Sequence, residues 1–125
     1  MISKSILKHT DHCGFKEEEV YGAYKIFFST LVSEPRLRII NLLRKGKKNV
    51  SEIMSEIGMD QTSASHNLAR LRKCGFVIVE TNKKFRYYKL NEKTIGPLMI
   101  LIDEHMKHNC IHILRKEKEG SKNGK

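Results

Sequence analysis

Three histidines and one cysteine recur at helical spacing near the C-terminal end, in a chain with only six histidines and three cysteines. They are His105, His108, Cys110 and His112, in the stretch DEHMKHNCIH. Residues three or four apart share one face of a helix, and imidazole and thiolate groups bind zinc, nickel and cobalt. The histidines could equally be polar neighbours of an apolar stripe, with Cys110 packing as a small hydrophobe. The pattern leaves both interpretations open.

The overall charge favours a polyanionic partner. The net charge is +10 and the isoelectric point is near 9.7, which suits nucleic acid or an anionic membrane surface. No apolar run approaches the roughly 18 residues that a membrane span needs, and the N-terminus lacks the apolar core of a signal peptide. We therefore expect a cytoplasmic protein. The cysteines, Cys13, Cys74 and Cys110, are too widely separated to indicate a disulfide framework.

The elements that must position these residues follow from periodicity and turn signals. Apolar spacing of three and four predicts helices over about residues 17–31, 35–45, 50–58 and 61–75. The third and fourth helices are joined by a few residues containing Gly58, which is a helix-turn-helix. Two β-rich runs, 76–79 and 85–90, then flank the polar turn TNKK. A last helix, capped by Thr94, runs to about Arg115.

This organisation predicts one domain of 125 residues with flexible ends. Residues 1–16 are expected to be a mobile arm, 17–115 a DNA-binding and dimerisation domain, and 116–125 a disordered basic tail. The arm also carries His9, His12 and Cys13, whose role the sequence leaves open.

The fourth helix and the hairpin carry the groups that suit DNA. A recognition helix enters the major groove while a hairpin follows the backbone or the minor groove. Gln and Asn can read adenine edges, and Ser or Thr can bond bases or phosphates. Between Glu34 and Leu90, thirteen Lys or Arg face five Asp or Glu, so eight of the ten net positive charges lie here. The predicted DNA contacts are Gln61, Thr62, Ser63, Ser65, His66, Asn67, Arg70, Lys83, Lys84 and Arg86.

These motifs resemble the ArsR/SmtB family of winged-helix regulators. The matching segments are LVSEPRLRIINLL, QTSASHNLARLRKCGFV and RYYKL, which lie in the order and spacing typical of the family. Glu34 stands where the family usually has Asp before the proline. The resemblance implies a mostly α winged helix-turn-helix, with four helices, a β-hairpin and a final helix. It also implies a homodimer joined by the first and last helices, bound to its operator until an inducer, often a metal ion, binds.

The apolar pattern of the last helix agrees with a dimer. A terminal helix with a broad apolar stripe beyond a small domain is expected to pack on a symmetry mate. The predicted interface residues are Tyr24, Phe28, Ile95, Leu98, Met99, Ile102 and Met106, and the stripe continues through Cys110 and Ile113.

The resemblance also suggests where a metal could bind. One class of the family uses two cysteines at the start of the third helix, where this chain has KNVSEIM and no cysteine. A second class pairs Asp-x-His with His-x-x-His/Glu across the dimer. The second half matches His105 and His108, whereas the first half falls on Glu92 and on Thr94, a poor ligand. The candidate ligands for zinc, nickel or cobalt are Glu92, His105, His108, His112 and Cys110.

The sequence therefore predicts a homodimeric, sequence-specific DNA-binding repressor of a palindromic operator, released by a metal ion. No nucleophile with a base partner, phosphate-binding glycine loop or paired carboxylates indicates an enzyme. Two alternatives remain: an architectural DNA-binding protein without an effector, and an adaptor whose winged helix binds another protein.

Overall fold

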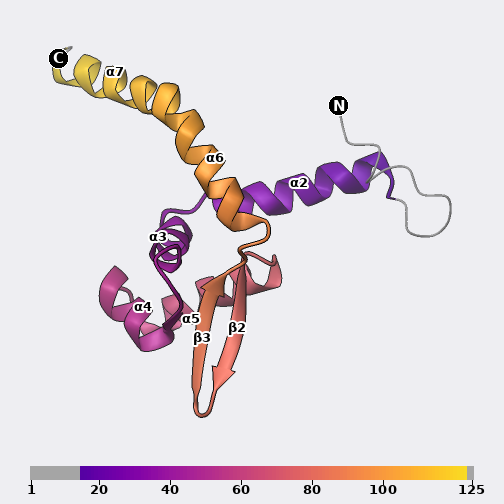
Figure 1. The fold of residues 1–125 in the computed structure, drawn as a ribbon. Helices are drawn as coiled ribbons and strands as arrows, with labels where there is room; N and C mark the ends of the chain where they lie inside the picture. The colour runs from indigo at the N-terminus through magenta and orange to yellow at the C-terminus, as the bar shows by residue number, and fades with distance from the viewer. Residues whose placement is uncertain (1–14, 124–125) are drawn as a thin grey trace.

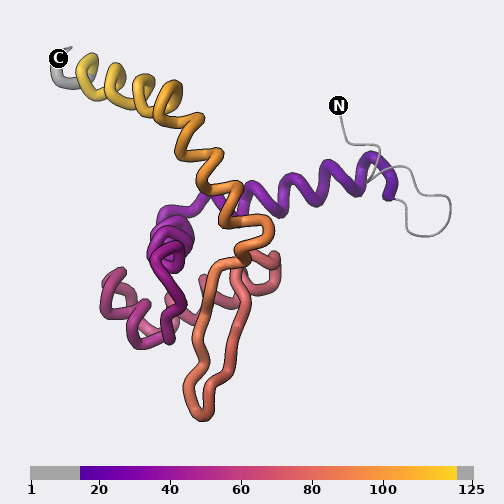
Figure 2. Tube along the Cα trace, viewed as in Figure 1, coloured from indigo at the N-terminus to yellow at the C-terminus, as the bar shows by residue number. Residues whose placement is uncertain are grey.

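The computed structural model describes residues 15–123, with side chains up to residue 120, as a chain of helices around a small sheet (Figures 1 and 2). Most of the expected arm, including His9, His12 and Cys13, lies outside the described residues. The elements are α2 (Glu17–Leu31), α3 (Glu34–Leu43), β1 (Lys48–Asn49), α4 (Val50–Ile57), α5 (Gln61–Lys73), β2 (Val77–Asn82), β3 (Phe85–Leu90), α6 (Ile95–His108) and α7 (Cys110–Asn123).

Polar caps start the two helices of the helix-turn-helix. The Asn49 side chain accepts the Glu52 N–H at 2.9 Å and opens α4. The Asp60 carboxylate accepts the Ser63 N–H at 2.7 Å and opens α5. Between them Gly58 adopts φ 79°, a left-handed conformation that glycine adopts without steric cost. The turn between the helices is therefore encoded locally.

The sheet is a hairpin with one short additional strand. Its order is β1-β3-β2, and both pairings are antiparallel. The two-residue strand β1, which pairs Lys48 with Tyr88, was not expected from the sequence. The predicted turn was also too wide, because β2 continues through Asn82 and only Lys83 and Lys84 connect the strands.

A single core joins the helices to the sheet. Its fully buried residues include Ile39, Ile40, Ile53, Leu68, Leu71 and Phe76. Burial of such side chains stabilises a fold by roughly 1.5–3 kcal/mol each before entropic costs. The helix-turn-helix lies beside the hairpin (Figure 1), where α5 contacts β2 and α4 contacts β3. The predicted mostly α winged helix-turn-helix is therefore confirmed.

The last helix differs from the prediction, because it breaks at Asn109 into α6 and α7. The Asn109 side-chain Nδ2 donates to the His105 carbonyl at 2.8 Å, the oxygen that the Asn109 backbone N–H would bind in a continuous helix. That N–H bonds the Met106 carbonyl instead. The helix then continues to Asn123, eight residues beyond its expected end at Arg115. Asparagine competes with helical backbone bonds in this way.

Within residues 15–123, no helix combines the length and apolar character needed to cross a bilayer.

Candidate nucleic-acid interface

The N-terminal half of α5 presents one polar, solvent-exposed face. Gln61, Thr62, Ser65 and His66 are exposed, whereas Ser63 is half-buried. The opposite face anchors the helix, because Ala64, Leu68 and Leu71 are buried in the core. Apolar residues at three- and four-residue spacing thus hold the helix, and the intervening hydrogen-bonding groups face outward.

Asn67 does not belong to this exposed face, contrary to the prediction. Its side chain is 8% exposed, and its Oδ1 accepts a hydrogen bond from Arg36 Nη1 at 3.2 Å. Its Nδ2 donates to the Ser63 carbonyl at 2.9 Å. Both ends of the amide are occupied, because a buried amide must satisfy its polar atoms inside the protein. Asn67 therefore positions the recognition helix and is not available to read a base.

Arg70, which was predicted to contact DNA, is half-buried and bonded within the protein. Its Nε donates to Thr30 Oγ1 at 2.9 Å and its Nη2 to Ser29 Oγ at 3.2 Å. Arg36 reaches the same turn of α2, donating from Nε to the Thr30 carbonyl at 2.7 Å and from Nη2 to the Ser29 carbonyl at 3.1 Å. We call this set, comprising Ser29, Thr30, Arg36, Asn67 and Arg70, the α2–α5 tether. It fixes the recognition helix to the end of α2.

The hairpin places its cations at the tip, as predicted. Lys83, Lys84 and Arg86 are all exposed. Lys83 has φ 58°, and it is the only non-glycine residue with positive φ among residues 15–123. The Arg86 guanidinium lies 5.8 Å from the centre of the Tyr88 ring, and a cation over an aromatic face is held in place by the ring quadrupole.

A groove of about 550 Å³ separates α5 from the hairpin. It contains Arg72 and Lys73, which the sequence analysis had not selected, in addition to the predicted Ser65 and Arg86. Arg72 lies two helical turns after Ser65 and therefore on the same face, so this spacing could have revealed it. Within the described residues, none of the three cations of the groove has a carboxylate within ion-pair distance. The groove thus combines hydrogen-bonding groups with uncompensated positive charge.

Other lysines of the hairpin region are neutralised by carboxylates. Lys89 Nζ and Lys47 Nζ lie 2.7 and 3.1 Å from Glu80, and Lys48 Nζ lies 3.3 Å from Glu56. The hydrogen bond from Lys89, followed by that from Lys47, holds the pKa of the Glu80 carboxyl below its ordinary value of 4.5. The same bond raises the pKa of Lys89. These pairs concentrate the available positive charge on the groove and the hairpin tip.

The candidate metal ligands do not form a cluster within one protomer. His105 and His108 lie exposed at the end of α6, Cys110 and His112 lie exposed on α7, and Glu92 is exposed in the turn before α6. Over residues 15–123, no group of three or more His, Cys, Asp or Glu side chains is arranged to hold a metal ion.

The apolar face of α6 is divided differently from the prediction. Ile95 and Met99 are 4% and 3% exposed because they pack in the core of their own protomer, which excludes them from a dimer surface. Leu98 and Ile102 pack partly against that core. The outward apolar residues are Met106 and, missed by the prediction, Ile100 and Leu101, together with Tyr24 and Phe28 of α2. A helical wheel shows which residues share an apolar face, but not whether that face packs in the core of its own protomer or on a second protomer.

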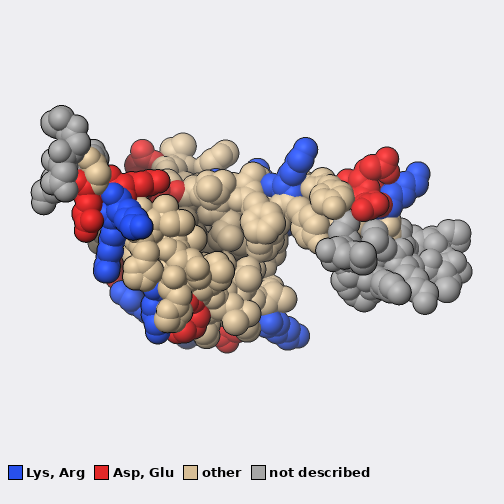
Figure 3. Space-filling model, turned by 90° about the horizontal axis from the view of Figure 1, so that it is seen from above, with Lys and Arg blue, Asp and Glu red and all other residues tan. Residues whose placement is uncertain are grey.

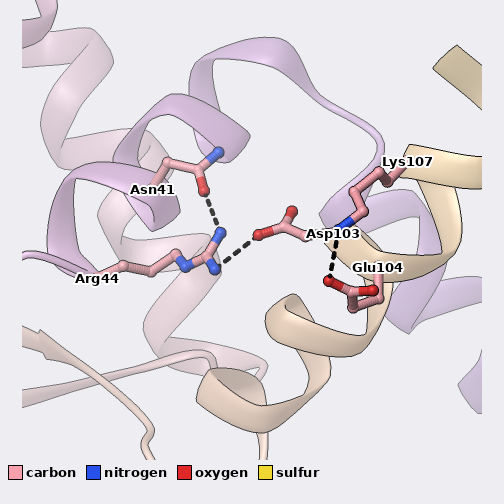
Figure 4. Close-up of polar contacts among 5 residues, drawn as sticks. All are labelled: Asn41, Arg44, Asp103, Glu104 and Lys107. Carbon is pink, nitrogen blue, oxygen red and sulfur yellow. Dashed lines mark hydrogen bonds and ion pairs between the residues drawn. The ribbon is translucent and has the colours of Figure 1, made fainter.

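An apolar groove of about 820 Å³ lies between α2, α3 and α6. Phe28, Val32 and Met106 line it. At its edge, Arg44 Nη2 lies 2.7 Å from Asp103 Oδ2 and fastens α6 to α3 (Figure 4). Seen from above, the surface between the two projecting ends of the molecule is mostly uncharged (Figure 3). This face combines exposed hydrophobic residues with few charges, as interaction surfaces do.

Comparison with known proteins decides the family. Residues 33–79, from the start of α3 through the first half of β2, match the family described as "Bacterial regulatory protein, arsR family". The HTH-type transcriptional regulator YbzH of Bacillus subtilis is 30% identical over 57% of this chain and 86% of its own length. The chain belongs to the ArsR family.

Other similarities place this ArsR-family regulator among winged-helix proteins. The homodimeric winged helix-turn-helix DNA-binding domain of Mb0332 from Mycobacterium bovis superposes with a TM-score of 0.70 at 23% identity, covering 80% of this chain and 93% of that domain. The regulator Rv0324 of Mycobacterium tuberculosis is 32% identical over 61% of this chain, but the match spans only 35% of Rv0324. The similarity therefore concerns the DNA-binding domain.

Proposed function

We propose that this ArsR-family regulator acts as a homodimer that binds a palindromic DNA operator and represses transcription. The exposed groups of α5 read base edges in the major groove, and the hairpin tip follows the phosphates. The groove between α5 and the hairpin carries this proposal, because Arg72, Lys73 and Arg86 converge there beside Ser65. Its action is binding, and we assign no residue a catalytic role.

The proposal can be tested because some residues should contact base edges and others only phosphates. Fluorescence anisotropy would compare the DNA upstream of the gene with a scrambled duplex of equal length. Replacing Ser65 and His66 by Ala should cost about 1–3 kcal/mol on the operator and little on the scrambled duplex. Replacing Arg72 or Arg86 by Ala should weaken both and lower the salt slope by about one.

Lys45→Ala provides the matched control, because Lys45 is exposed in the turn after α3 and does not line the groove. It removes one positive charge and should leave operator affinity nearly unchanged. Equal affinity for both duplexes would instead indicate an architectural DNA-binding protein. Unchanged DNA affinity in the Ser65, His66 and Arg86 Ala variants would indicate a protein-binding adaptor.

We further propose that a divalent transition metal releases the operator. His105 and His108, three residues apart on α6, would supply imidazole ligands, and Glu92 of the partner subunit would supply a carboxylate, with His112 and Cys110 as additional donors. The described donors of one protomer do not converge on one point, so in this proposal the ion joins two protomers and alters their relative position. Zinc, nickel or cobalt would be titrated into the dimer bound to its operator. Absence of both metal binding and DNA release would refute this part, whereas loss of the response in a His105/His108 double Ala variant would locate the site.

A further inference from the structure

A cleft between α2 and the C-terminal end of α5 has the size and composition of a small-molecule site. Its volume is about 470 Å³, within the range of pockets that bind small ligands. The apolar side chains of the cleft come mainly from α2, and its two cations come from α5. The lining residues are Ala23, Ile26, Phe27, Arg70, Lys73 and Cys74.

This cleft lies away from the α2 residues that were predicted for the dimer interface. At about 100° per residue, Ala23 and Ile26 lie at least about 100° around the helix from Tyr24 and Phe28. The apolar groove between α2, α3 and α6, which contains Phe28, has none of the lining residues of the cleft. The cleft is therefore a separate surface that one protomer builds by itself.

The apolar wall of the cleft is anchored in the core. The half-buried Phe27 ring lies 5.0 Å from the ring of the buried Phe76. Ile26, the next lining residue, is 56% exposed. The half-buried Cys74 thiol lies 3.2 Å from Thr30 Oγ1. An apolar group bound here would cover Ile26 and Phe27, and removal of their surface from water favours binding.

The two cations of the cleft have charge available for an anion. Within residues 15–120, no carboxylate lies within ion-pair distance of Arg70 or Lys73. A guanidinium has five N–H donors, and the α2–α5 tether occupies only the Nε and one Nη2 donor of Arg70. The planar fork of arginine matches the two oxygens of a carboxylate. A ligand with a carboxylate head and an apolar body therefore suits this lining.

The same two cations connect the cleft with the DNA-binding surface. Lys73 lines both the cleft and the groove between α5 and the hairpin. Arg70 holds the recognition helix to the end of α2 through the tether. A carboxylate in the cleft competes with phosphate for Lys73 and with the hydroxyls of α2 for Arg70. Ligand and DNA therefore oppose each other, and linkage requires that this opposition be mutual.

We propose that this cleft is an effector site for a small amphipathic carboxylate, such as a medium-chain fatty acid. The carboxylate binds Arg70 and Lys73, and the apolar tail covers Ile26 and Phe27. The ligand weakens operator binding, and this part of the proposal rests on the DNA-binding function proposed above. The cleft contains none of the candidate metal ligands of α6 and α7.

Isothermal titration calorimetry on the DNA-free protein tests the site without relying on the regulator function. Octanoate should bind, whereas octanol, which has the same tail and no charge, should bind at least about fivefold more weakly. Butyrate keeps the charge but has a shorter tail, so it should bind at least about tenfold more weakly than octanoate. Equal affinities for octanoate and octanol would show an apolar surface without an anion site and would overturn the proposal.

Matched lysine variants locate the bound octanoate. Lys73→Met should weaken its binding about fivefold, and Ala23→Phe should weaken it by filling the cleft. Lys25→Met is the control, because Lys25 is exposed on α2 but lines the apolar groove between α2, α3 and α6. It should leave the affinity within about twofold. A loss in Lys25→Met with none in Lys73→Met would place octanoate in that groove and contradict the proposal. Circular dichroism would establish that every variant keeps its helices.

Cys74 gives a second measurement of occupancy at the cleft. Its thiol is half-buried there, whereas Cys110 is exposed on α7. Octanoate should slow the alkylation of Cys74 by iodoacetamide, followed by mass spectrometry of the peptides, and leave that of Cys110 unchanged. Equal protection of both thiols, or protection of neither, would exclude binding at the cleft.

The effect on DNA is measured by fluorescence anisotropy with the duplex from upstream of the gene. Saturating octanoate should raise the dissociation constant for this DNA about tenfold, and the effect should disappear in Ala23→Phe. Octanoate binding with unchanged operator affinity would contradict the link between the cleft and DNA. If the protein is indifferent to operator DNA even without octanoate, the proposed function fails, and calorimetry and alkylation alone decide the cleft.

Discussion

At Lys83 the backbone conformation does not suit the residue type. Its left-handed φ of 58° is unfavourable for a residue with a Cβ. Asn82, one residue earlier, would tolerate that conformation better. The register prevents this choice, because Val77 opposite Leu90 and Val79 opposite Tyr88 turn their side chains toward the core. A slip of one residue would turn them outward.

Replacing Lys83 by Gly should therefore stabilise the fold and weaken DNA binding at once. The relief of backbone strain should raise the free energy of unfolding by about 0.5–1 kcal/mol, measured by urea denaturation. Loss of the cation should lower the salt slope of DNA binding by about one.

Lys84→Gly is the matched control for this prediction. It removes the same charge, but Lys84 does not share the positive φ, so added chain entropy should make it slightly destabilising. Equal stability changes in both variants would show that strain at Lys83 is negligible.

At the scale of elements, the break at Asn109 sets the direction of α7. The Asn109 side chain occupies the His105 carbonyl and prevents the backbone bond that would continue α6. A sequence pattern could not reveal this, since asparagine occurs within many exposed helices at a modest cost. The same limit applies to β1, whose two residues carry no periodic signal.

Asn109→Ala should join α6 and α7 into one helix and redirect α7. Helical circular dichroism should increase, because Ala favours helix by several tenths of a kcal/mol over Asn. Dimerisation should nevertheless weaken, because the redirection would move the exposed Ile111 and Leu114 of α7 relative to the outward apolar face of α6. Lys107→Ala, two residues before Asn109 on a different side of the helix, removes only an exposed ion pair with Glu104 and should leave the dimer unchanged. An unchanged dimer in Asn109→Ala would show that the direction of α7 is irrelevant.

At the scale of the whole molecule, the fold was more predictable than the surfaces. Caps, glycine stops and the change of period after Gly75 are local signals, and they led to the winged helix. The partner that a side chain packs against is often distant in the sequence, so local signals do not reveal it. Asn67 and Arg70 have the chemistry of DNA contacts, but Arg36 and the end of α2 occupy them. Ile95 and Met99 similarly satisfy a dimer pattern while packing in their own core.

The outward side of α6 offers a test of the assembly as a whole. Leu101 is 67% exposed on α6, so Leu101→Glu should place a charge in the dimer interface and shift the protein toward monomer. Operator affinity should fall at least about tenfold, because one half-site then binds alone. Light scattering and anisotropy would measure the two effects.

The predicted stripe included Ile113, but the break at Asn109 separates this residue from the outward face of α6. Ile113→Glu is therefore the corresponding control, at a residue that is 60% exposed on α7. It should alter neither measurement. Equal dissociation in both variants would mean that the dimer uses a different face of the last two helices.

The α2–α5 tether couples the dimer interface to the recognition helix, because it joins the end of α2 to α5. The last turn of α2 contains no basic residue of its own. Its Ser29 and Thr30 carbonyls accept hydrogen bonds from Arg36 of α3, and the hydroxyls of the same two residues accept from Arg70 of α5. Fraying of that turn would free Arg36 and Arg70 and loosen Asn67 together. The recognition helix would lose its alignment just as two additional cations became available for phosphates. The molecule would then exchange discrimination between sequences for indiscriminate, salt-sensitive adhesion to DNA.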